Sequence, residues 1–131
     1  MIRQHPGEKI LIVDDEANVR SVLLKHFEEE GSACIASPNA LDALDQMTRQ
    51  DFSLIISDVM MPGMSGMEFL RLAKKQSPET AFIMITGLMD INTAIDSLRI
   101  GAYDFITKPF ELAAIRRAVD RALDRRRLLI E

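Results

Sequence analysis

The stretch Ile10-Leu11-Ile12-Val13-Asp14-Asp15 decides the fold class of this 131-residue chain. Four consecutive apolar residues, with no alternation of polar side chains, predict a strand that is buried on both faces. Such strands belong to parallel sheets, whose crossover helices cover both faces. The two aspartates follow at the carboxyl end of the strand, where ligands bind in open parallel sheets. The stretch therefore predicts an α/β protein with an acidic site at one edge of its sheet.

The rest of the chain alternates between short apolar runs and segments of helical periodicity. We expect further strands over residues 32–36, 52–57, 81–85 and 103–107. Helices are expected over residues 17–30, 39–50 and 111–130, at positions 67–73 ahead of Ser77-Pro78, and at positions 91–98 ahead of Gly101. Five strand–helix units in succession predict a five-stranded parallel sheet with helices on both faces. We expect its strands in the flavodoxin-like order 2-1-3-4-5.

The length and composition indicate one globular domain. Apolar residues make up 47% and charged residues 27% of the chain, a composition that excludes disorder. Residues 1–110 contain 16 acidic and 10 basic side chains, whereas residues 111–131 contain four acidic and six basic ones. Because the body of the chain has no cationic surplus, we expect no direct binding to nucleic acid.

The targeting and cysteine patterns further narrow the class of protein to which the chain can belong. No run approaches the ~20 apolar residues of a membrane span, and residues 1–7 lack the apolar core of a signal peptide. We therefore expect a cytoplasmic protein whose domain does not bind membranes. The single cysteine, Cys34, excludes an intramolecular disulfide and argues against a cysteine-based zinc site.

Acidic residues, a threonine and a lysine stand at the carboxyl ends of the predicted strands. Asp14-Asp15 follow the first strand, Asp58 the third, Thr86 the fourth and Lys108 the fifth. In the flavodoxin-like order the first and third strands are neighbours, so the three carboxylates converge. Three such anions repel one another unless a cation shares the site. A set of oxygen ligands suits Mg²⁺ as that cation.

This combination of side chains suits the transfer of a phosphoryl group to a carboxylate. An aspartate can act as a nucleophile that forms an aspartyl phosphate. The transferred group needs its oxygens neutralised by a metal and by donors such as an ammonium or a hydroxyl. Asp58 fits the acceptor, Asp14 and Asp15 the metal ligands, Lys108 the counter-charge and Thr86 the hydroxyl donor. Each residue alone is unspecific, whereas four strand ends with one consistent chemistry are specific.

Four segments of the chain resemble the receiver domain of two-component response regulators. They are residues 10–16, 55–66, 85–87 and 101–110, which occur in the family's order and spacing within residues 8–125. The loop after Asp58, with Pro62 and Gly66, is the most specific of them. The segments together identify the chain as similar to that family.

The resemblance implies a phosphoacceptor and a metal site. Asp58 would receive a phosphoryl group from a histidine kinase or a phosphotransfer protein. Mg²⁺ would contact Asp15, Asp58 and the backbone carbonyl of Met60, while Asp14 would act mostly through water. The protein would then catalyse only its own phosphorylation and dephosphorylation, and would not otherwise be an enzyme.

The resemblance also implies a conformational switch. Lys108 would pair with the phosphoryl oxygens, Thr86 would move toward them, and Phe105 would turn inward behind it. The Lys108-Pro109 peptide would be cis, which proline makes accessible. The second residues after the acceptor and after the threonine, Met60 and Leu88, are apolar and cannot orient a water molecule, so we expect slow self-dephosphorylation.

The sequence suggests a division of the chain into three parts. Residues 1–7 are expected to be a disordered leader, residues 8–123 the receiver domain, and residues 124–131 the start of a helical linker toward an output domain. A homodimer through the fourth helix, fifth strand and fifth helix is left open. The apolar positions of the fourth helix are expected to lie mostly in the core; they are Ile91, Ala94, Ile95 and Leu98.

Two other functions share part of the motif. A Mg²⁺-dependent phosphatase with an aspartyl nucleophile would use Asp58, but it needs an acid two residues later, where Met60 stands, and a substrate-covering cap. A phosphorylation-independent interaction module can use the same fold, because a fold does not fix a function. The intact acidic pair, acceptor, threonine and lysine argue against the second alternative.

Overall fold

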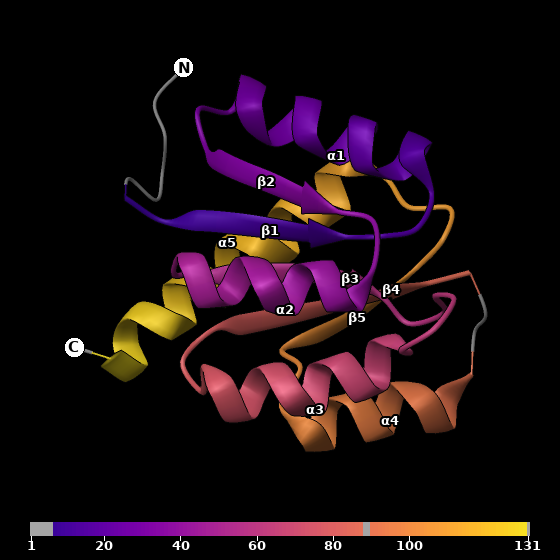
Figure 1. The fold of residues 1–131 in the computed structure, drawn as a ribbon. Coiled ribbons are helices and arrows are strands. Elements are labelled where there is room, and N and C mark those ends of the chain that lie inside the picture. Colours follow the sequence, from indigo (N-terminus) through magenta and orange to yellow (C-terminus); the bar gives the residue numbers. More distant parts are fainter. Residues whose placement is uncertain (1–6, 88–89, 131) are drawn as a thin grey trace.

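The computed structural model describes residues 7–87 and 90–130 and contains five strands and five helices within them. The strands are β1 (Lys9–Val13), β2 (Ala33–Ser37), β3 (Leu54–Asp58), β4 (Ala81–Thr86) and β5 (Asp104–Thr107). The helices are α1 (Ala17–Glu29), α2 (Ala40–Arg49), α3 (Gly66–Gln76), α4 (Ile91–Ile100) and α5 (Leu112–Ile130). Strands and helices alternate along the whole described chain, as the sequence predicts (Figure 1).

The strands form one sheet in the order β2-β1-β3-β4-β5, and every neighbouring pair is parallel. This confirms the predicted flavodoxin-like α/β fold. One boundary differs in a way that matters for the site: β3 begins and ends later than expected. Asp58 pairs in register with Ile85 of β4, so it is the last residue of the strand and not the first residue of the loop.

The alternating side chains of β1 enter two separate cores, one on each face of the sheet. Ile10 and Ile12 pack with residues of α1 and α5, whereas Leu11 and Val13 pack with residues of α2 and α3. Figure 1 shows the corresponding layers of helices around the sheet. All four side chains are fully or almost fully buried, and each contributes about 1.5–3 kcal/mol of apolar burial. The apolar run therefore makes β1 a strand that is covered on both faces.

The fourth helix is placed differently from our expectation. Ile91, Ile95 and Leu98 are 72%, 41% and 48% exposed, and Ser97 is the buried residue of α4. Helix α4 reaches the core mainly through its carboxyl end, where Ile100 packs against the α2–α3 side. The apolar stripe of α4 is therefore a surface, and the prediction that it lies mostly in the core is wrong. The helical period predicts one apolar face, but it cannot predict which way that face points.

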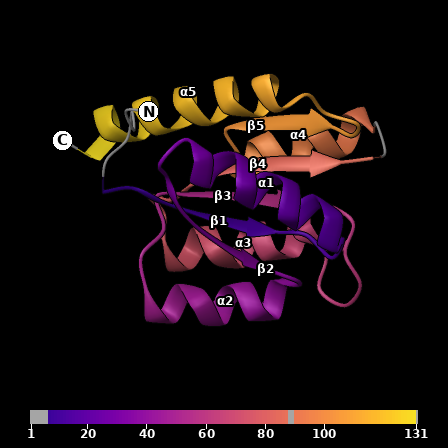
Figure 2. The same cartoon turned by 90° about the horizontal axis from the view of Figure 1, so that it is seen from above.

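Helix α5 packs on the sheet as predicted, and its last turns contact the beginning of the described chain. Ile115, Ala118, Val119, Ala122 and Leu123 form its buried face. In the next turn the Arg127 guanidinium contacts the Glu8 carboxylate at 3.1 Å. Figure 2 shows the end of α5 beside the beginning of β1. Of the expected leader, only Gly7 lies within the described residues. No helix among residues 7–87 and 90–130 is long and apolar enough to cross a membrane.

Gly66 allows the loop after β3 to fold back onto the strand. Its amide donates a hydrogen bond to the carbonyl of Val59 at 2.9 Å, and the side chain of Ser65 caps α3 by accepting from the Glu68 amide at 3.2 Å. A Cβ atom at Gly66 would overlap the carbonyl oxygen of Asp58 and lie 2.7 Å from Cα of Val59. Because glycine has no side chain, the start of α3 can pack directly against the backbone of Asp58.

We predict that Gly66→Ala lowers the free energy of unfolding by about 2–3 kcal/mol, because backbone atoms must move to admit the methyl group. Urea denaturation measures the change. Gly87→Ala is the matched control, since a Cβ there meets no atom within 4 Å. Equal stability of the two variants would show that the contact between Gly66 and the strand end is not restrictive.

Candidate functional site

Strand register brings two aspartates together at the carboxyl edge of the sheet. Val13 of β1 pairs with Ser57 of β3, so the next residues along, Asp14 and Asp58, lie side by side. Asp14 is 2% and Asp58 4% exposed. Both were predicted as site residues, and the parallel order of β1 and β3 accounts for their convergence.

Lys108 lies between the carboxylates of this edge. Its Nζ atom is 3.1 Å from Asp14 Oδ2, 3.2 Å from Asp58 Oδ2 and 2.9 Å from Glu16 Oε1. The backbone amide of Lys108 donates to the carbonyl of Thr86 at 2.7 Å, which fixes the end of β5 beside the end of β4. The Lys108-Pro109 peptide is cis, as the resemblance implies. One ammonium group thus contacts three carboxylates from two strand ends and a helix start.

Electrostatic repulsion remains at Asp58 despite this lysine. Burial raises the pKa of Asp58 above its ordinary value of 3.8, and the neighbouring carboxylate of Asp14 raises it further. The hydrogen bond and charge of Lys108 lower the pKa of Asp58 in part. Burial on its own disfavours the charged Lys108, but the bonds to Glu16, Asp14 and Asp58 outweigh it, so the pKa of Lys108 is raised. The site therefore carries more negative charge than one lysine neutralises.

Backbone amides hold the two aspartates in place. The amide of Glu16 donates to Asp14 Oδ1 at 2.9 Å, and the amide of Met60 donates to Asp58 Oδ1 at 3.3 Å. The guanidinium of Arg20 donates to the carbonyl oxygen of Asp14 at 2.8 Å. The two amide bonds each hold the Oδ1 atom of one carboxylate, and the Arg20 bond holds the backbone of Asp14. The side chain of Met60 is 58% exposed, so it stands at the mouth of the site.

The two predicted switch residues lie on neighbouring strands beside the aspartates. Thr86 ends β4 and is buried, one residue beyond the Asp58–Ile85 pair. Phe105 of β5 pairs with Met84 of β4, is half-buried and packs against the core on the α2–α3 side. Leu88, expected to influence water access, lies outside the described residues. Thr86 therefore adjoins the acidic edge, and Phe105 lies further back along the sheet.

The acidic group differs in one member from the prediction. Within the described part of the chain, one carboxylate oxygen from each of Asp14, Glu16 and Asp58 lies within 4.8 Å of the others. Asp15 is exposed and is not in this group of three. Glu16 directly follows the two aspartates in the sequence, but it was not predicted as a site residue. It is the N-cap of α1 and makes no side-chain capping bond, because its carboxylate contacts Lys108 instead.

The donor set fits a hard divalent cation. All three clustered ligands are carboxylate oxygens, two of them almost fully buried, and oxygen ligands of this kind bind Mg²⁺ or Ca²⁺ in preference to softer metals. Burial is the main cause of the raised pKa of Asp58, and repulsion by the Asp14 carboxylate adds to it; a second cation would relieve that repulsion. The residues present are therefore compatible with a metal site.

Most of the sequence matches one protein family. The family model of the response regulator receiver domain aligns with residues 10–120, which include the complete acidic edge. The chain belongs to the response regulator receiver family. Receiver domains of this family are signalling modules of two-component systems, so the resemblance seen in the sequence is confirmed.

Individual receiver proteins resemble this chain over most of its length. Sporulation initiation phosphotransferase F of Bacillus subtilis is 35% identical over 117 residues, which are 89% of this chain and 94% of that protein. The uncharacterized transcriptional regulatory protein YkoG of the same organism is 38% identical over 114 residues, 87% of this chain. The beryllofluoride-activated NtrC4 receiver domain dimer superposes with a TM-score of 0.86 at 31% identity, over 90% of this chain and 98% of that one.

Several relatives are much longer than the matched region. The chain spans 50% of the length of YkoG and 24–27% of the length of other transcriptional regulators that it matches. It spans nearly all of phosphotransferase F. Receiver domains similar to this one therefore occur both alone and as one part of a larger regulator.

We predict that Lys108→Gln destabilises the receiver domain by about 2–4 kcal/mol near pH 7 without divalent cations, because it leaves buried carboxylates without their counter-charge. The variant's Asp58 pKa rises further, so the folded form binds more protons than the unfolded one and stability falls as pH rises. Thermal denaturation from pH 7 down to pH 4 should show the deficit shrinking as the carboxylates are protonated.

Lys75→Gln, on the exposed surface of α3, is the control and should change stability little at any pH. Addition of Mg²⁺ should restore part of the stability of Lys108→Gln. A deficit that stays constant from pH 7 to pH 4 would mean that the lysine stem, and not its charge, is what the fold needs.

Proposed function

We propose that Asp58 accepts a phosphoryl group from a histidine kinase or a phosphotransfer protein, in a reaction that needs Mg²⁺, and that this changes the conformation of the domain. The observation that carries the proposal is the contact of Lys108 Nζ with both Asp58 and Asp14, at 3.2 and 3.1 Å, at the strand ends of a receiver-family chain. A nucleophilic carboxylate beside a fixed ammonium is the arrangement that phosphoryl transfer requires.

The side chains around Asp58 have separate roles in this proposal. A carboxylate oxygen of Asp58 attacks phosphorus, an O–P bond forms, and the bond from phosphorus to the donor's nitrogen breaks. In the unmodified domain, contacts with Asp14 and Glu16 hold Lys108 beside the reacting oxygen. Its ammonium then leaves Asp14 and contacts the transferred group. Thr86, at the end of β4, supplies a hydroxyl to the new phosphoryl oxygens. Its movement passes to Phe105, which lies on the adjacent strand.

Mg²⁺ is the cation that we propose for the acidic edge. Asp14, Asp15, Asp58 and the backbone carbonyl of Met60 would hold it, and the structure adds the Glu16 carboxylate as a neighbour. When bound, Mg²⁺ supplies positive charge that offsets the charge of about −1.5 to −2 that a phosphoryl group adds. Without it, Lys108 alone would face both the carboxylates and the phosphoryl group.

We further propose that residues 8–123 act as the receiver domain and that residues 124–131 begin a linker to an output domain. The longer relatives support this, since the chain spans about a quarter of several of them. A homodimer through α4, β5 and α5 is supported by the exposed apolar stripe of α4 and by the dimer formed by the NtrC4 receiver domain. The cytoplasmic location stays a prediction.

Acetyl phosphate with Mg²⁺ should place one phosphoryl group on the wild-type chain, and intact-mass spectrometry should detect it. Asp58→Ala should abolish the modification, because it removes the proposed acceptor that lies beside Lys108 and the end of β4. Asp51→Ala, an exposed aspartate before β3, is the matched control and should be modified like the wild type. We expect the modified protein to lose the group slowly, over minutes or longer, because Met60 cannot orient water.

The same experiment separates the alternatives. Modification that persists in Asp58→Ala would contradict the proposed acceptor. Continuous release of phosphate from a small phosphoester would instead favour the aspartyl-nucleophile phosphatase. Absence of any modification, together with unchanged spectra on adding beryllofluoride and Mg²⁺, would leave the phosphorylation-independent interaction module.

A further inference from the structure

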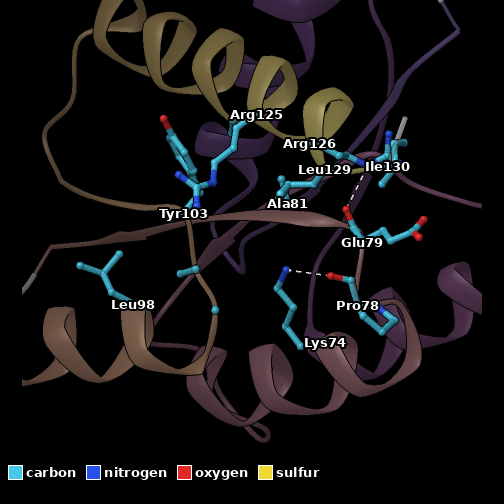
Figure 3. A pocket seen from close by; sticks show the side chains of 13 residues that line it. Lys74, Pro78, Glu79, Ala81, Leu98, Tyr103, Arg125, Arg126, Leu129 and Ile130 are labelled. Carbon is cyan, nitrogen blue, oxygen red and sulfur yellow. Dashed lines mark hydrogen bonds between the residues drawn. The ribbon is translucent and has the colours of Figure 1, made fainter.

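A cavity lies at the opposite end of the sheet from Asp58. It has a volume of about 510 Å³ and opens between the end of α3, the end of α4 and the last turns of α5. Ala81 at the start of β4 and Tyr103 just before β5 form part of its wall. Figure 3 shows side chains reaching into it from both the α3 and the α5 sides. The volume is in the range of small-molecule sites, about 300–1,000 Å³.

One cation of the cavity is a lysine without a carboxylate partner among the described residues. Lys74 Nζ donates to the backbone carbonyls of Thr80 at 2.7 Å and of Pro78 at 3.3 Å, and it lies 5.8 Å from the ring centre of Phe82. Burial lowers the pKa of Lys74 below its ordinary value. The carboxylate of Glu79 also belongs to the lining, but Figure 3 shows it extending away from Lys74. Among the described residues, the charge of Lys74 is therefore stabilised by two carbonyl dipoles and an aromatic ring, and not by a carboxylate.

A second cation that has no carboxylate partner among the described residues lines the cavity from α5. Arg125 is exposed and makes no ion pair with any residue that the structure describes, and Tyr103 makes no side-chain hydrogen bond with those residues; both line the cavity and are labelled in Figure 3. The neighbouring Arg126 differs, since it donates to the carbonyl of Glu79 at 3.0 Å and lies 3.8 Å from the Glu8 carboxylate. Arg125 and Tyr103 thus offer donors that residues 7–87 and 90–130 do not use.

Apolar side chains complete the cavity. Leu98 of α4 and Leu129 and Ile130 of α5 line it and are 48%, 73% and 42% exposed. They stand on either side of the cationic groups in Figure 3. Exposed leucine and isoleucine side chains gain about 25 cal/mol for each Å² of apolar surface that a ligand removes from water. The cavity therefore combines unpaired positive charge with uncovered apolar walls.

We propose that this cavity binds an amphipathic carboxylate, with the anionic group at Lys74 and Arg125 and the apolar body against Leu98, Leu129 and Ile130. An anion would compensate two cations that have no carboxylate partner, and charged hydrogen bonds are stronger than neutral ones. The Tyr103 hydroxyl is available as an additional donor. This inference does not depend on the phosphorylation of Asp58, since the cavity is at the other end of the sheet.

Octanoate is the probe for this proposal, and it should produce saturable amide shifts in a ¹H–¹⁵N titration of the chain. The shifts should centre on the start of β4, on Tyr103 and on the end of α5. Acetate, which lacks the apolar body, and 1-octanol, which lacks the charge, should each bind at least about tenfold more weakly. Arg125→Gln should weaken octanoate binding by about tenfold, the effect of losing one charged donor.

Arg121→Gln is the matched control, because Arg121 is an exposed arginine one turn earlier on α5 that does not line this cavity. Its affinity for octanoate should equal that of the wild type, and so should that of Asp58→Ala. Equal binding of octanoate and 1-octanol, or unchanged binding in Arg125→Gln, would overturn the proposal. Shifts that depend on protein concentration without octanoate would overturn it too, since they would show that a second copy covers the cavity.

Discussion

Carboxylates at the edge of the sheet can stay this close only because a cation lies among them. Lys108 contacts Asp14, Glu16 and Asp58 within 3.2 Å, and two of those carboxylates are almost fully buried. Without such a cation, buried carboxylates this close together would repel one another, and some of them would bind protons. The sheet order, the register of β1 with β3 and the bond from the Lys108 amide to Thr86 all serve to place these four groups together.

This constraint also bears on the phosphorylation that we propose at Asp58. Three carboxylates face one ammonium at this edge, so negative charge is in excess. Burial and, after it, the Asp14 carboxylate raise the pKa of Asp58 although Lys108 is adjacent. A divalent cation and a phosphoryl group would change that balance in opposite directions, so in the proposed mechanism the domain's response depends on how Lys108 is shared among the anions. Lys108 directly follows β5, and in this mechanism it would link the chemistry at Asp58 to the end of that strand.

Much of this arrangement follows from local sequence, and the remainder depends on how elements pack. The run before Asp14 predicts a doubly buried strand, and parallel strand ends predict the convergence of Asp14, Asp58 and Lys108. Glu16 was missed because its role depends on the start of α1, where its carboxylate turns to Lys108 and not to the helix. The exposure of Ile91 was missed because periodicity does not determine which face of α4 meets the sheet. The cavity near Arg125 combines several elements distant in sequence, and no motif marks it.

A crystal structure of the chain with Mg²⁺ and beryllofluoride tests the central claim most directly. We predict that beryllofluoride is bonded to Asp58, that a metal ion lies among the carboxylates of this edge, and that Lys108 Nζ has left Asp14 to contact a fluoride. The account is contradicted if Asp58 stays unmodified at saturating beryllofluoride. It is equally contradicted if Lys108 keeps its contacts with Asp14 and Glu16 while the acceptor is modified.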